Sequence, residues 1–301
     1  MRVTAPLPLS LVSSNVSASA YDPWSGTTAY TRGDKVFYNP LSDIVGHEYE
    51  ALTDHTNSPP VVDGTTDWID LGPDNRSAMF DSKIGTVTSA NGNILVSITP
   101  QGYFDSIALI RVLNAITITI TVTRSGQTLY TDYFNAYQDA AEWGGYFFGE
   151  RIMLRNAVSI IPQMFYKDCT VIVNIQGTAG QEVSCALLMI GRSYYLGVTS
   201  NEPKVGIQDY STKEVDTFGN AFLLERAYAD RASVNIQLNT AQLDAVRRKL
   251  ATYRASPVLY DLNNDDTHYE SLIIFGYYDE FDITLAFPTV SYCTLSVQSL
   301  I

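Results

Sequence analysis

Residues 81–195 contain several short apolar runs typical of β-strands, and one of them has a strict two-residue period of apolar and polar side chains. In the clearest run, 116–123, isoleucine or valine occupies every even position and threonine every odd one. Such a strand buries one face in a core and leaves a threonine ladder on the other face. Further strands are predicted at 93–98, after the Asn-Gly turn at 91–92, and at 169–175 and 183–190, which the Gly-Thr-Ala-Gly run at 177–180 connects. Short strands separated by turns predict a β-sandwich of jelly-roll type for this part of the chain.

The first 80 residues contain shorter strand signals, set among glycine, proline, aspartate and aromatic residues. Strands are expected at 35–38 and 47–52, and the Asn-Ser-Pro-Pro run at 57–60 predicts a turn. A β module of this size has little aliphatic core of its own. It therefore needs a neighbour or a cluster of aromatic side chains.

The last third of the chain mixes strand patterns with one helix pattern. A hairpin is expected between 218–226 and 233–238. Further strands are expected at 258–260, 271–278, 282–287 and 292–297. A sheet with a single packed helix predicts an α+β unit over 196–301.

The helix is expected between a cap at Asn239 or Thr240 and Pro257, which ends it. Its buried stripe has helical spacing and consists of Leu243, Val246 and Leu250.

Charge divides the chain further. The 301 residues include 19 Lys and Arg against 32 Asp and Glu, a formal net charge of −13. Residues 1–80 have 4 basic and 10 acidic side chains, 81–195 have 7 and 8, and 196–301 have 8 and 14. The nearly neutral middle suggests three domains: an N-terminal extension with a small β module, a β-sandwich and an α+β domain. The acidic balance argues against a phosphate-backbone binder, so no nucleic-acid partner is expected.

Targeting and redox signals are weak. No run approaches the ~20 apolar residues of a membrane helix, so membrane insertion is not expected. The start of the chain has an apolar run like that of a leader. Pro6 and Pro8 interrupt this run and predict that it is not removed. Three cysteines do not make a disulfide framework in a chain of this length. We expect small buried side chains at Cys169, Cys185 and Cys293.

Candidate metal ligands are few. The run 261–266 is faintly similar to a calcium loop, but Asp266 occupies its glycine position and Leu272 its glutamate position. An Asn/Asp turn is expected there instead. The histidines, which lack the spacing of zinc ligands, are His47, His55 and His268.

Paired carboxylates are the machinery of most glycosidases. Candidates are Glu48 with Glu50, and the group of Asp279, Glu280 and Asp282. In an acidic protein such residues are expected on solvated faces. The sequence also has no nucleophile elbow, phosphate loop or dinucleotide fingerprint. We predict no catalytic residue, no metal and no cofactor. A polysaccharide-degrading enzyme is kept as an alternative, behind the two functions given at the end of this section.

Aromatic side chains are dense in the first module. Flat rings stack on the apolar faces of sugars, with polar neighbours bonding the hydroxyl groups. The alternative is that the same rings form the small core of the module. The candidate carbohydrate-binding residues are Trp24, Tyr30, Tyr38, Tyr49 and Trp68.

The spacing of several of these residues resembles the chitinase-type carbohydrate-binding module. The pattern is Tyr-x-x-Gly-Asp-x-Val at 30–36, Tyr-x-Ala at 49–51, a proline pair at 59–60, and Trp68. In that family a pair of exposed tryptophans commonly follows the Tyr-x-Ala element. Here Leu-Thr-Asp stands at 52–54. The resemblance implies the scaffold of such a module.

The closing region resembles that of tailed-bacteriophage tail-tip or baseplate proteins. The linker 72–81 is also similar to phage proteins that carry such a sugar-module scaffold. The segments that carry the first resemblance are 206–211, 216–220, 226–229, 275–281 and 293–297. By analogy with distal-tail proteins, a split-barrel-like fold is expected for the α+β unit.

These resemblances imply a structural virion component of a phage tail tip or baseplate, assembled in the host cytoplasm. Its expected partners are other tail proteins and copies of itself. The alternative is a receptor-recognition protein that contacts host surface glycans through the aromatic module.

Overall fold

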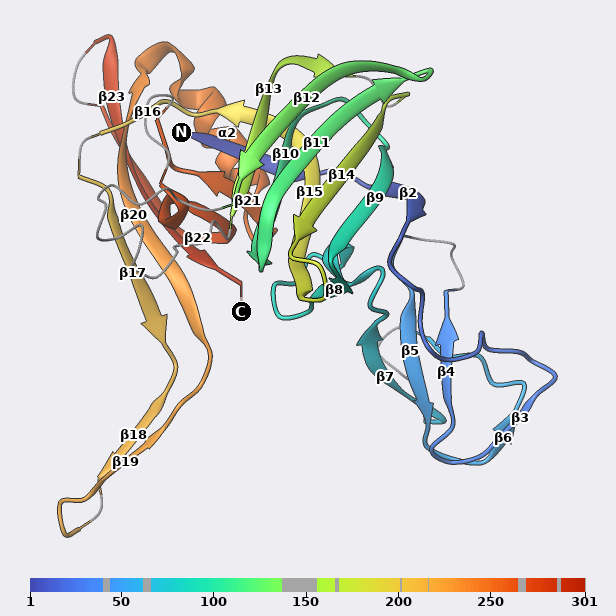
Figure 1. The fold of residues 1–301 in the computed structure, drawn as a ribbon. Coiled ribbons are helices and arrows are strands. Elements are labelled where there is room, and N and C mark those ends of the chain that lie inside the picture. Colours follow the sequence, from blue (N-terminus) through green and yellow to red (C-terminus); the bar gives the residue numbers. More distant parts are fainter. Residues whose placement is uncertain are drawn as a thin grey trace. The chain divides into compact units, whose positions relative to one another are not determined.

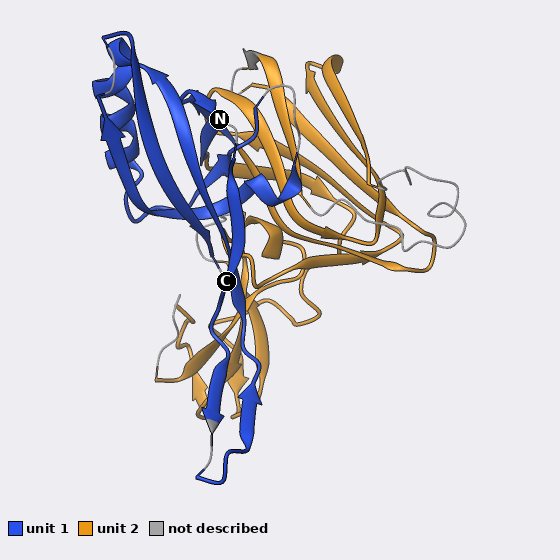
Figure 2. Ribbon diagram, turned by 90° about the vertical axis from the view of Figure 1, so that its left-hand side faces the viewer, with its two compact units in different colours: residues 1–6, 191–301 blue, residues 7–190 orange. Residues whose placement is uncertain are grey.

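The protein is mainly β and forms several sheets (Figure 1), as the sequence predicted. The chain divides into two compact units, unit 1 with residues 1–6 and 191–301 and unit 2 with residues 7–190 (Figure 2). Within the described stretches, no helix is long and apolar enough to cross a membrane. The computed structural model describes residues 1–39, 44–61, 66–136, 156–165, 168–200, 202–215, 217–264, 269–285 and 288–300.

Unit 2 contains a β-sandwich, as expected. One sheet has the order β12-β11-β14-β9-β2 and is antiparallel throughout. Its strands are β12 (Gln127–Asn135), β11 (Ala115–Arg124), β14 (Thr170–Gly177), β9 (Asn93–Pro100) and β2 (Leu9–Ser14). The second layer belongs to an eleven-stranded sheet, and its strands in this part of the chain are β13 (Ala157–Phe165), β10 (Phe104–Leu113), β15 (Glu182–Tyr195) and β8 (Thr88–Asn91). A short 3-10 helix, η1 (Ala78–Phe80), precedes β8.

The alternating run 116–123 lies in β11, and the predicted burial of one face is confirmed. Ile118, Ile120 and Val122 are fully buried, while the intervening threonines are half-buried on the opposite face. The buried face joins a core cluster with Phe104 and Leu109 of the second sheet. The two-residue period therefore identified correctly which side chains fill the sandwich.

The aromatic module, which we define as strands β3 to β7, also lies in unit 2. Strands β4 (Lys35–Tyr38), β5 (His47–Ala51) and β7 (Trp68–Pro73) form one sheet. A second, two-stranded sheet pairs β3 (Ala29–Tyr30) with β6 (His55–Thr56). The strands expected at 35–38 and 47–52 are confirmed.

Unit 1 is built on the rest of the eleven-stranded sheet, in the order β1-β21-β22-β23-β20-β16; β17 also pairs with β20, and β1 pairs with residues 191–195 of β15. Its strands are β1 (Arg2–Pro6), β21 (Val258–Asp261), β22 (Ile273–Thr284), β23 (Val290–Ser299), β20 (Tyr228–Asn239), β16 (Val198–Thr199) and β17 (Lys204–Asp209). Two 3-10 turns, η2 (Thr240–Gln242) and η3 (Glu270–Leu272), complete it.

Helix α2 (Leu243–Thr252) packs on the core of unit 1 as predicted. Val246 and Leu250 are buried in that core, and Leu243 packs against it. Asn239 accepts a hydrogen bond of 2.9 Å from the backbone N–H of Ala241, so it caps the η2 turn that leads into the helix.

Three strand assignments differ from the sequence prediction. Residues 1–6, which the charge pattern grouped with the first module, form β1 of unit 1 between β15 and β21. The expected strands 271–278 and 282–287 are mostly one strand, β22, with an irregularity in its pairing at 278–280. The acidic run 279–282 lies at this irregularity. In the sequence it was interpreted as a loop between two strands.

The third difference concerns the predicted hairpin between 218–226 and 233–238, which is wrong. Strand β19 (Ala221–Leu224) pairs with β18 (Thr212–Val215), and β20 pairs with β17. The four strands make one long hairpin. The side-chain period of a strand shows which of its faces is buried, but it does not show which strand it pairs with. The pairing partners are therefore known only from the structure.

All three cysteines are buried and unpaired, as predicted. Burial raises the pKa of Cys185 from 9.0 to about 12. Burial also raises the pKa of Cys293 from 9.0 to about 11. In each case the interior disfavours the charged thiolate.

The free energy of unfolding is expected to fall as the pH rises from about 9 toward 12, because the unfolded chain loses these two thiol protons first. The two neutral thiols make their full contribution to the free energy of unfolding below pH 9. Urea unfolding at a series of pH values measures the slope, and Cys185→Ala/Cys293→Ala should make it shallower. Equal slopes for the wild type and this variant would contradict the prediction.

Candidate functional site

Three of the five predicted sugar-contact residues form the core of the aromatic module. Trp68 and Tyr49 are almost completely buried, and Tyr30 is 7% exposed. The rings of Tyr30 and Trp68 meet edge to face, with their centroids 5.2 Å apart. The Trp68 indole N–H donates to the carbonyl of Ser58 at 2.8 Å. The faces of these rings are covered by protein, so these three residues are core and cannot stack on a sugar.

The other two predicted residues, Trp24 and Tyr38, are only partly buried. Their rings pack edge to face at 5.3 Å. Backbone bonds place them, since the N–H of Trp24 donates to the carbonyl of Phe37 at 2.8 Å. The indole N–H of Trp24 is buried and has no hydrogen-bond partner. These two side chains are what remains of the predicted carbohydrate site.

The Gly-Asp element of the resemblance forms a tight turn. Gly33 has a φ of +94°, which favours glycine. The Asp34 carboxylate accepts hydrogen bonds from the backbone N–H of Thr31 at 2.7 Å and from its hydroxyl at 3.0 Å. These two bonds lower the pKa of Asp34, and the bond from the backbone N–H of Thr31 has the larger effect. The turn is thus built by local chemistry, whatever the module binds.

The candidate carboxylates of this module have structural partners. Glu48 accepts a hydrogen bond of 2.5 Å from Ser19, and Glu50 lies 3.6 Å from the Lys35 ammonium. His47 Nδ1 lies 3.0 Å from the Asp70 carboxylate. Each pairing ties neighbouring segments of the module together, and none forms a two-carboxylate arrangement.

The Asn/Asp run after β21 forms a turn in its described part. The Asn263 amide donates to Asp261 at 2.9 Å and to the carbonyl of Tyr269 at 3.1 Å, and its oxygen accepts from the N–H of Tyr269 at 2.7 Å. Residues 265–268, with His268 and Asp266, lie outside the described residues. In the part of the chain that is described, no three His, Cys, Asp or Glu side chains gather as metal ligands would.

A serine and an aspartate meet where the edge strands of the sandwich approach each other. The buried Ser159 of β13 donates to the Asp132 carboxylate of β12 at 2.6 Å. The Tyr130 hydroxyl lies 3.2 Å from the same oxygen and 3.3 Å from Ser159. Burial is the main reason that the pKa of Tyr130 is raised. The sequence did not single out this group. It joins the edges of two sheets, and its hydrogen bonds explain it as a structural tie.

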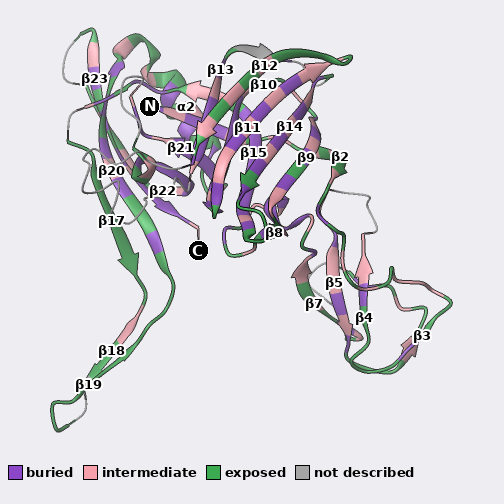
Figure 3. Cartoon of the chain, viewed as in Figure 1, coloured by how far each residue is buried: buried purple, intermediate pink, exposed green. Residues whose placement is uncertain are grey.

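The most unusual surface of the protein is the end of the long hairpin, which we call the arm: β18, β19 and their connecting loop. Every described side chain of β19 is exposed, including Phe222 at 61%, Leu223 at 72% and Leu224 at 59%. Phe218 in the loop is 90% exposed. Figure 3 shows the arm as an exposed ribbon that extends away from the sheet of unit 1. The sequence suggested assembly of the chain with tail proteins and with copies of itself but did not identify the arm.

A two-stranded ribbon is marginally stable in water by itself. Contiguous exposed apolar side chains mark interaction sites more often than chance. The arm therefore has the properties of a surface that another molecule covers.

Comparisons with family models, with curated proteins and with solved structures found no match of any kind. The functional argument therefore depends on the geometry of the chain and on the residues named above.

Proposed function

We propose that this protein is a non-enzymatic structural component of a bacteriophage tail tip or baseplate. In this proposal it assembles in the host cytoplasm and joins neighbouring tail proteins and copies of itself in the virion. The observation that carries the structural role is the arm, whose apolar side chains at 222–224 are exposed in the single chain. The resemblance of segments such as 206–211 and 275–281 supports the assignment to a phage tail.

An arm of this kind suits assembly for a physical reason. Its two strands pair only with each other among the described strands, so their outer edges are free for pairing with another chain. Burying three large apolar side chains contributes roughly 1.5–3 kcal/mol each. A neighbour that covers the arm would thus stabilise both itself and the ribbon.

Replacing two arm residues on one face, Phe222→Ser/Leu224→Ser, is expected to reduce or abolish assembly while unit 1 stays folded. The exposed apolar pair makes few contacts within the chain, so its loss costs little intrinsic stability. Mass photometry and electron microscopy of the purified protein, alone and with tail proteins, measure the effect. Leu223→Ser tests the opposite face of the same strand.

The matched control is Val87→Ser, which removes an apolar side chain that is 45% exposed in unit 2. It should assemble like the wild type. A wild-type protein that stays monomeric and is absent from purified virions would contradict the proposed function.

A second candidate function, glycan recognition, is favoured by the partly exposed pair of Trp24 and Tyr38. The partly exposed Trp24 ring offers a flat apolar face on which a sugar could stack. We expect Trp24→Ala to lower glycan affinity about tenfold or more in calorimetry, since the stacking area is lost. Val61→Ala, at a side chain 48% exposed, is the control in the same module. Unchanged affinity in a folded Trp24→Ala variant would remove this candidate.

A further inference from the structure

Strand β2 is an edge of the sandwich, and no described strand pairs with its outer side. It stands at the end of the five-stranded sheet, and β9 is its one partner among the described strands. The pairing shifts between Leu11 and Ser13, so Val12 bulges and is 61% exposed. An edge strand presents backbone N–H and C=O groups that can pair with an added strand.

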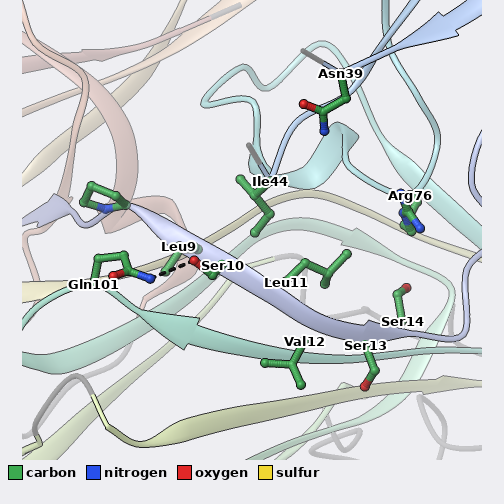
Figure 4. A pocket seen from close by; sticks show the side chains of 11 residues that line it. Leu9, Ser10, Leu11, Val12, Ser13, Ser14, Asn39, Ile44, Arg76 and Gln101 are labelled. Carbon is green, nitrogen blue, oxygen red and sulfur yellow. Dashed lines mark hydrogen bonds between the residues drawn. The ribbon is translucent and has the colours of Figure 1, made fainter. Parts of the chain in front are cut away.

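A groove of about 690 Å³ runs along β2 within unit 2. Figure 4 shows that Ile44, Asn39 and Arg76 contribute to it from elements other than β2. On β2 itself, the Ser10 hydroxyl accepts a hydrogen bond of 2.7 Å from Gln101. The groove thus combines a free strand edge with apolar side chains and one cationic side chain.

Arg76 shows what chemistry would fill this groove. Its Nε is buried and has no hydrogen-bond partner, and no carboxylate of the described residues forms an ion pair with it. A buried donor without an acceptor costs roughly 1–3 kcal/mol. A carboxylate binds a guanidinium through two parallel hydrogen bonds, so an acidic side chain would satisfy it best. The expected occupant is an extended, apolar strand that carries a carboxylate.

The arm supplies a strand of this composition. Strand β19 is Ala-Phe-Leu-Leu, fully exposed, and Glu225 follows it directly. Its free edge has four residues and that of β2 has six, so the two lengths are compatible. Strand β18 fits less well, because its sequence Thr-Lys-Glu-Val has one large apolar side chain where β19 has three, and Lys213 adds a second cation beside Arg76.

We propose that β19 of a second copy of this chain adds to the edge of β2, with Glu225 bound to Arg76. The proposal rests on the structural role proposed above and names its contact. The apolar side chains of β19 cover Leu9, Leu11 and Ile44, and backbone bonds extend the five-stranded sheet. The contact joins two different surfaces of one chain, so it is heterologous and repeats from copy to copy into a ring or an open filament.

Charge exchange between the two residues tests the proposal in the full-length protein. Arg76→Glu and Glu225→Arg should each raise the dissociation constant of self-association about tenfold or more, because each places like charges together. The double variant should recover to within about threefold of the wild type, since the pair is restored with opposite polarity. Sedimentation equilibrium measures the constants, and circular dichroism checks the fold. Arg32→Glu makes the same charge change at an exposed arginine outside the groove and should have no effect.

A peptide gives a second measurement that needs no substitution in the arm of the full-length chain. A labelled peptide with the sequence of residues 219–227 should bind the wild-type chain. N-methylation of alternate backbone nitrogens should abolish binding, because the added strand can no longer donate its hydrogen bonds. Binding should also be lost with Arg76→Glu and regained by a Glu225→Arg peptide.

The outcomes separate this inference from the proposed function. Self-association that depends on Phe222 and Leu224 but not on Arg76 would overturn the groove as the docking site and leave the structural role standing. Cross-links between β19 and β2 within one chain, seen in mixtures of isotopically labelled copies, would overturn the second copy as occupant. Arm-dependent binding to lipid vesicles, with no binding of the peptide, would likewise overturn it.

Discussion

Trp68→Ala should unfold the aromatic module and lower its free energy of unfolding by about 3–5 kcal/mol. Trp68 is completely buried at the centre of the module. Its ring contacts His55 at 4.7 Å and Tyr30 at 5.2 Å between centroids, and its indole N–H bonds Ser58. The other buried side chains of this core are few, so the cavity would not be filled by rearrangement.

Hydrogen exchange of the backbone amides of β5 is the suitable measurement, because it reports on the module separately from the sandwich. In Trp68→Ala these amides should lose their protection while those of β11 keep theirs. Trp24→Ala is the matched control, since Trp24 is only partly buried and should cost much less. Wild-type protection of β5 in Trp68→Ala would contradict the assignment of Trp68 to the core.

Gly276→Ala should destabilise unit 1 by more than the ~1–3 kcal/mol that an added methyl group usually costs in a packed core. Gly276 lies in β22, where it pairs with Val258 of β21 and Ser299 of β23. A Cβ at this position would lie 1.9 Å from the carbonyl oxygen of Gln298 and 2.8 Å from the Cα of Ser299. Both are backbone atoms, so a central pair of strands would have to separate.

The control is Gly206→Ala in β17, where an added Cβ meets nothing within 4 Å. It should be neutral or stabilise by about 0.4–1 kcal/mol through the lower entropy of the unfolded chain. Urea unfolding monitored by hydrogen exchange in β21 to β23 compares the two variants. Equal stability of Gly276→Ala and Gly206→Ala would show that the strands at Gly276 can separate at no cost.

The two surfaces proposed for assembly share one physical property. Both the arm and β2 end in strand edges that no described strand covers, and both expose apolar side chains beside them. Natural sheet proteins usually protect such edges with charges, prolines or covering loops. Pairing the edge of β19 with the edge of β2 would bond the free backbone groups of both strands and cover the apolar side chains beside them. For this reason we prefer a second copy as the occupant.

Much of the candidate site was visible in the sequence as composition but not as geometry. The aromatic cluster was identified. Its division into a buried core of Tyr30, Tyr49 and Trp68 and a partly exposed pair depends on how the short strands of the module pack. The exposed apolar run 222–224 reads in the sequence like any buried strand, because periodicity does not reveal whether a partner strand covers it. Arg76 likewise carried no signal, since its isolation depends on side chains distant in the sequence.

The sequence by itself determined the features that depend on local chemistry. These are the alternating strand 116–123, the helix with Val246 and Leu250 inward, the buried cysteines, and the turn at Gly33 and Asp34. Only the tertiary structure decided which strands pair: β18 with β19, β17 with β20, and β1 beside β21. The reason is physical. A strand's side-chain pattern reports which face is buried, whereas its partner is chosen by backbone hydrogen bonds and packing with residues far away in the chain.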